Sequence, residues 1–100
     1  MTLTSQETLK ARILLILHSS ENGSLRRSEV LMRLRAAYKD RWTAEDEMAP
    51  KSRPFETNWA NRASFARADL VRDGLLRERT SGTWALTDRG WTEASLLAEE

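Results

Sequence analysis

The apolar residues near the N-terminus recur with the 3.6-residue period of a helix. Thr4, followed by Glu7 three positions later, fits a capping box and predicts where this helix begins. The turn-forming residues 19–23, with the sequence SSENG, predict where it ends. The stripe expected to enter the core comprises Leu9, Ile13, Leu14, Leu15, Ile16 and Leu17.

A second helix is predicted after a short extended run. Residues 24–27, with the sequence SLRR, favour an extended link or a single edge strand. Ser28 is expected to cap the helix, with Glu29 in its first turn. Residues 43–57 hold both prolines, which predicts a long connection that begins with one acidic helical turn. The buried face of the second helix would comprise Val30, Leu31, Leu34 and Tyr38.

The third predicted helix covers about residues 58–72 and has the most regular pattern. Apolar residues recur along it at i, i+4, i+7 and i+11, and Gly74 stands where a helix commonly ends. We expect Phe65 to broaden this apolar stripe and to pack in the core. The stripe itself consists of Trp59, Ala63, Ala66 and Leu70.

Residues 75–87 alternate as a β-hairpin does. A three-residue loop at 80–82, with Gly82 in the left-handed conformation, pairs Leu76 with Leu86. This register places three apolar residues on one face, which can cover the core: Leu76, Trp84 and Leu86. It places three polar residues on the solvated face: Arg77, Arg79 and Thr83. Thr87 is then expected to cap a last helix, whose buried side would be Trp91, Ala94 and Ala98.

The order is helix, extended segment, helix, connection, helix, hairpin, helix. This order is typical of a winged helix-turn-helix, a mainly α fold with a small β-hairpin. A length of 100 residues predicts one domain over residues 1–100. The helix at 58–72 would be the recognition helix, which fits the DNA major groove by its diameter, and the hairpin at 75–87 would be the wing.

Composition narrows the classes of function. The chain has no cysteine and one histidine, which argues against disulfides, thiolate metal sites and a conventional metal cluster. No catalytic constellation is visible, so we expect neither an enzyme nor a cofactor. The longest apolar run is too short to cross a bilayer, and no signal peptide is visible, so we expect a cytoplasmic protein without membrane contact.

The net charge of +1 does not by itself indicate a polyanion partner, but 13 of the 16 basic residues are arginine. Arginine makes bidentate contacts with phosphates and with guanine edges, and asparagine can read adenine. An arginine-rich proteome would account for the same composition, so the positions of the arginines in the fold must decide whether they bind DNA. The residues we expect to contact double-stranded DNA are Lys51, Arg53, Asn58, Asn61, Arg62, Ser64, Arg77, Arg79 and Thr83.

Residues 61–90 carry a resemblance to a known family. The run NRASFARADLVRDGLLRERTSGTWALTDRG resembles the N-terminal winged-helix domain of Mrr-type restriction endonucleases. This resemblance implies a DNA-reading module of restriction or defence proteins, with a nuclease domain or subunit as its partner. The matching residues are Asn61, Arg62, Phe65, Ala66, Leu70, Gly74, Leu75, Gly82, Trp84, Leu86, Thr87 and Gly90. At the position of Phe65 the family more often has tryptophan. For Phe65 we favour packing in the core over a role in a pocket for a modified base.

The alternative is a protein-interaction or dimerisation module without DNA binding, and a homodimer is compatible with either function. The near-neutral charge suits this alternative equally well, and the acidic run at 44–47 suits a DNA surface only if it points away. Arg62 could pair with Glu56 or Asp69 instead of DNA, an ion pair of little energetic value. DNA binding requires five basic residues to converge on one face: Lys51, Arg53, Arg62, Arg77 and Arg79.

Overall fold

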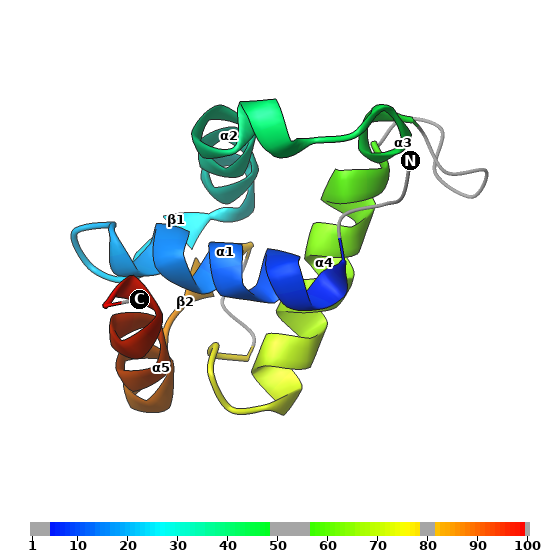
Figure 1. Ribbon diagram of the computed structural model, residues 1–100. Coiled ribbons are helices and arrows are strands. Elements are labelled where there is room, and N and C mark those ends of the chain that lie inside the picture. Colours follow the sequence, from blue (N-terminus) through cyan, green and yellow to red (C-terminus); the bar gives the residue numbers. More distant parts are fainter. Residues whose placement is uncertain (1–4, 49–56, 79–81, 100) are drawn as a thin grey trace.

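The computed structural model describes residues 5–48, 57–78 and 82–99, without the side chains of Lys39 and Glu45. Within these ranges, no helix is long and apolar enough to cross a membrane. The elements, shown in Figure 1, are α1 (Gln6–His18), β1 (Ser24–Arg26), α2 (Arg27–Ala37), the 3-10 helix η1 (Lys39–Arg41), α3 (Ala44–Glu47), α4 (Asn58–Arg72), β2 (Thr83–Ala85) and α5 (Asp88–Ala98).

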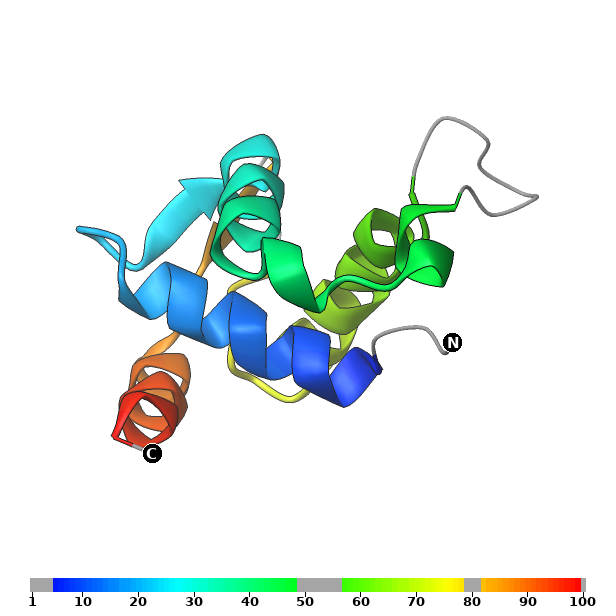
Figure 2. The same cartoon turned by 45° about the horizontal axis from the view of Figure 1, so that its top comes forward.

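Helix α1 is the central element of the fold. It lies between α5 on one side and α2 and α4 on the other (Figure 2). Three residues of its apolar stripe, Leu9, Ile13 and Leu17, are completely buried. Leu70 of α4 and Leu34 of α2 are also completely buried in the same core. Burial of each such side chain contributes about 1.5–3 kcal/mol, so this contiguous core holds the helices together.

Strands β1 and β2 form an antiparallel pair between α2 and α5 (Figure 1). Leu25 lies opposite Trp84, and Arg26 lies opposite Thr83. The short run SLRR therefore supplies an edge strand, which was one of its two expected conformations. The fold is mainly helical with a small sheet, and the order of its elements agrees with the winged-helix class.

The base of the wing has the predicted register. Leu76 and Leu86 form an isolated antiparallel bridge. The amide of Arg77 donates to the carbonyl oxygen of Ala85 at 2.8 Å, and the amide of Thr87 donates to that of Leu75 at 3.1 Å. The core-facing apolar residues of the wing are buried as expected: Leu76, Trp84 and Leu86.

Three expectations about helix ends and faces are corrected. Helix α1 is capped by Ser5, whose Oγ accepts a hydrogen bond from the amide of Thr8 at 3.2 Å. Helix α2 begins at Arg27, so Ser28 lies inside the helix and does not cap it. Ala98 is exposed because it stands at the last turn of α5, beyond the reach of the core. The cap of α5 by Thr87 is confirmed, since its Oγ1 accepts from the amide of Gly90 at 3.0 Å.

Candidate nucleic-acid interface

Helix α4 coincides with the predicted recognition helix, and its two sides differ sharply. The buried side contains Trp59, Ala60, Ala63, Ala66 and Leu70. With about 100° of rotation per residue, the residues opposite this side also form a continuous stripe at i, i+4, i+7 and i+11. This outward stripe consists of Asn61, Phe65, Ala68 and Arg72, of which Asn61 is half-buried and the others are exposed.

Phe65 is not a core residue, contrary to the expectation from its size and apolar character. It is 58% exposed on the outward stripe of α4. Its position follows from helical geometry, because it lies about 200° around the helix from Ala63, which is completely buried. An aromatic ring therefore stands in the middle of the surface that would face a groove.

Arg27 joins the start of α2 to the recognition helix. Its guanidinium Nη2 donates to Ser64 Oγ at 3.1 Å. Its backbone amide donates to the carbonyl oxygen of Gly82 at 2.9 Å, on the C-terminal side of the wing loop. One residue thus brings α2, α4 and the wing together, and it holds Ser64 on the flank of α4 that faces α2.

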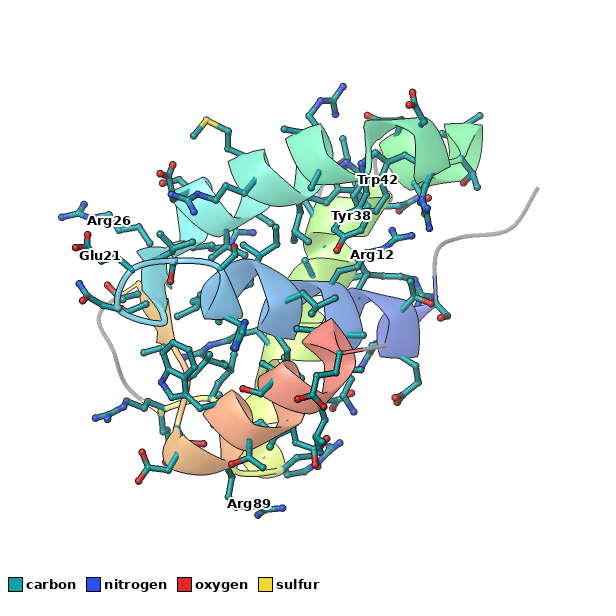
Figure 3. The ribbon with its side chains drawn as sticks, turned by 60° about the vertical axis from the view of Figure 1, so that its left-hand side comes forward. Arg12, Glu21, Arg26, Tyr38, Trp42 and Arg89 are labelled. Atoms are coloured by element: carbon teal, nitrogen blue, oxygen red, sulfur yellow. The ribbon has the colours of Figure 1, made fainter. Side chains whose placement is uncertain are left out.

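Arg26 extends this surface onto the outer face of the sheet. It is the last residue of β1 and pairs with Thr83, so both side chains lie on the face opposite Leu25 and Trp84. Arg26 is exposed and points away from the molecule (Figure 3). Arg26 and Arg27 were absent from the predicted contact set. Two adjacent arginines at the start of a helix could have indicated a phosphate contact there.

Arg77 is an exposed cation at the base of the wing, as expected from its place on the solvated face. Its backbone is fixed by the hydrogen bond to Ala85. Its Nε lies 3.5 Å from the carbonyl oxygen of Leu86, a long hydrogen bond that leaves the guanidinium at the surface.

Arg62 stands apart from Ser64. The two residues are about 200° apart around α4, so Arg62 lies on the opposite flank of the outward stripe. Of the two ion pairs expected to compete with DNA for Arg62, the one with Asp69 does not form, and the one with Glu56 concerns a residue outside the described ranges. Asp69 instead accepts from Arg72 at 2.7 Å and from the side chain of Gln6. The side chain of Arg62 makes no hydrogen bond or ion pair with any residue that the structure describes.

The acidic helix α3 does not oppose a DNA surface with free carboxylates at Asp46 and Glu47. Asp46 is completely buried and forms a reciprocal cap with Thr43 at 2.9 and 3.0 Å. Glu47 accepts two hydrogen bonds from Arg35, at 3.1 and 3.0 Å. The carboxylates of Asp46 and Glu47 are thus already engaged in local hydrogen bonds.

An aromatic cluster fixes the N-terminal end of α4. Trp59 is buried and stacks on Trp42, with ring centroids 4.9 Å apart. The guanidinium of Arg12 lies 4.4 Å from the ring centre of Tyr38 and 5.2 Å from that of Trp42 (Figure 3). Burial lowers the pKa of Arg12, but arginine remains charged at neutral pH. Asn58, the first residue of α4, is held beside this cluster by the bond from its amide to Met48.

The structure therefore brings together only some of the DNA contacts that were predicted from the sequence. Ser64 and Thr83 are each joined to one of the adjacent arginines, while Arg62 and Arg77 are not joined to this surface by any hydrogen bond among the described residues. Lys51, Arg53 and Arg79 lie outside the described residues. We call the surface formed by Arg26, Arg27, Ser64, Thr83 and the outward stripe of α4 the candidate interface.

One family model, described as the Mrr N-terminal domain, matches residues 9–95. The match contains α2, α4, both strands and the whole candidate interface. No curated protein and no solved structure matches the chain.

Proposed function

Because the chain belongs to the Mrr N-terminal domain family, we propose that it is a DNA-binding module of a restriction or defence system. Helix α4 enters the major groove with its outward stripe towards the base edges. Arg26 and Arg27, with Arg77 of the wing, contact phosphates on the flanking backbone. The module has no catalytic activity of its own, and a nuclease domain or subunit cleaves the DNA that it binds.

The observation that carries this proposal is the path of hydrogen bonds from Gly82 through Arg27 to Ser64. It links the wing, the start of α2 and α4, which are the three elements that a winged helix sets against DNA. Groups suited to nucleic acid lie on or beside these elements: the guanidinium of Arg26 just before α2 and that of Arg77 at the base of the wing for phosphate, and the amide of Asn61 on α4 for a base edge. The carboxylates of Asp46 and Glu47 are already engaged elsewhere.

A salt titration tests the proposal directly. Binding of a labelled duplex about two helical turns long would be measured between about 50 and 200 mM salt by fluorescence anisotropy. We expect log K to fall linearly with log salt, with a slope of about −0.9 for each phosphate contacted. Unmodified and cytosine-modified duplexes would be compared in the same series. Absence of saturable binding to either duplex at the lowest salt would contradict the proposal.

One observation favours a second candidate, a protein-interaction or dimerisation module. Phe65 is 58% exposed, and exposed aromatic residues are common at the centre of protein interfaces. Sedimentation of the chain over a range of concentrations distinguishes the two. An interaction module that self-associates through this surface would lose its dimer when Phe65 is replaced by alanine, and it would bind no DNA.

A further inference from the structure

Phe65 is the aromatic residue of the outward stripe of α4. It is 58% exposed, whereas Trp59 on the same helix is 5% exposed. Asn61 precedes it by one turn, and Ala68 follows it by nearly one turn, so it lies between an amide and a methyl group on one face. The core does not require this ring, because the buried side of α4 is complete without it. The ring is therefore available to contact a ligand on this face of α4.

We propose that Phe65 contacts the C5-methyl group of a pyrimidine in the major groove, thymine being the first candidate. This inference rests on the proposed DNA binding, and it names the feature of DNA that the helix selects. The thymine methyl is an apolar group on a base edge of unmodified DNA, and apolar side chains, phenylalanine among them, contact it. A 5-methylcytosine would present the same group at the same place.

The neighbour of Phe65 supplies a matching polar contact. Asn61 can form a bidentate pair with N6 and N7 of adenine. Four residues of helix advance about 6 Å, and successive base pairs are about 3.4 Å apart. Asn61 and Phe65 therefore reach positions about two base pairs apart, so the helix would favour an adenine and a 5-methylpyrimidine at that separation.

Two other uses of an exposed phenylalanine fit the surroundings less well. Apolar wedges that unstack base pairs enter from the minor groove, whereas a helix of α4's diameter fits the major groove. A protein partner would require a larger apolar patch than one ring. Around Phe65 the candidate interface instead carries polar and cationic groups, with Ser64 adjacent and Arg72 two turns further along the stripe. These polar and cationic groups can contact phosphates of the DNA backbone while the ring contacts a methyl group.

The test compares three duplexes of one mixed sequence. The first contains thymine, the second contains uracil in place of every thymine, and the third contains 5-methylcytosine in place of every cytosine. Uracil removes the methyl group and leaves the pairing edge unchanged. Each duplex is titrated with the parent chain, with Phe65→Ala and with Leu96→Ala. Leu96 is the matched control because it is 55% exposed on α5, outside the candidate interface.

We expect the parent chain and Leu96→Ala to bind the thymine duplex more tightly than the uracil duplex, by about fourfold for each methyl group buried. Phe65→Ala should bind the two duplexes equally. A gain of affinity for the third duplex that also disappears in Phe65→Ala would extend the contact to 5-methylcytosine. If the third duplex shows no such gain, the contact is assigned to thymine alone.

Two results would overturn the inference while leaving DNA binding intact. The parent chain could bind thymine and uracil duplexes equally with a normal salt slope, or Phe65→Ala could keep the preference of the parent. If the parent binds none of the three duplexes, the proposed function itself fails. Because Phe65 is exposed, its replacement should leave the helical circular dichroism signal and the melting temperature close to those of the parent.

Discussion

Gly90 packs so closely against the carbonyl oxygen of Leu75 that a side chain at this position would overlap the backbone. The contact joins the first turn of α5 to the base of the wing. Two further bonds secure the same junction, because Thr87 donates through its amide to Leu75 and through its hydroxyl to Gly74. The position of the wing is thus tied to the start of α5 as well as to β1.

This contact predicts that Gly90→Ala destabilises the fold. In an exposed helix, replacement of glycine by alanine gains about 1 kcal/mol through helix propensity. At Gly90 the sign should reverse, with a loss of about 3 kcal/mol, because the new methyl group meets backbone rather than a movable side chain. Urea unfolding would measure the change. Glu93→Ala, at an exposed position of the same helix, should change stability by less than about 0.5 kcal/mol.

Trp84 should be a major source of stability. It is 4% exposed and lies on the inner face of β2, beside Leu76 and Leu86 in the core. Truncation to alanine should cost about 3–5 kcal/mol, because a large cavity would open between the sheet and the helices. The free energy of unfolding, extrapolated from denaturant titrations, would provide the value. A loss below about 1 kcal/mol would mean that the sheet does not cover the core in solution.

Apolar periodicity was sufficient to predict α4 and the base of the wing. Both depend on local rules: a stripe at i, i+4, i+7 and i+11, and a two-residue alternation around a glycine turn. Phe65 shows where the interpretation was wrong. Its apolar character was given more weight than its angle on the helix, which places it opposite Ala63. Residue type predicts burial only on average, whereas the wheel position would have predicted exposure.

The pairing of β1 with β2 could not be predicted from periodicity. Residues 24–26 and 83–85 are distant in sequence, and three residues are too few to show an alternation. The roles of Arg26 and Arg27 depend on this pairing, because it brings the start of α2 beside the wing. The sequence therefore predicted contacts at Ser64 and Thr83 but not at the two arginines that the structure places beside them. The choice of Ser5 over Thr4 as a cap is a shift of one residue, which is a common uncertainty at helix ends.

Arg26 of the candidate interface and Arg77 at the base of the wing should contribute affinity without sequence preference. Replacing both Arg26 and Arg77 with alanine should weaken binding to every duplex by a similar factor. It should also flatten the log–log salt dependence by about 0.9 for each phosphate that the two side chains no longer neutralise. Arg89→Ala is the control for Arg26→Ala alone, since each removes one positive charge and the Arg89 side chain on α5 points away from Arg26 (Figure 3). An equal effect of the control would indicate a general charge effect instead of defined contacts.

Asn61 should contribute preference among sequences. It stands on the outward stripe of α4, so its amide can reach a base edge, whereas Arg62 lies about 100° away on the flank towards α1. Asn61→Ala should cost about 1–3 kcal/mol on the preferred sequence and little on others. Arg62→Ala should instead weaken all sequences alike, because a flanking guanidinium reaches the phosphates before the bases. Selection of binding sites from a random duplex library, repeated with each variant, would compare them. Equal loss of affinity on every sequence in both variants would show that α4 does not read bases.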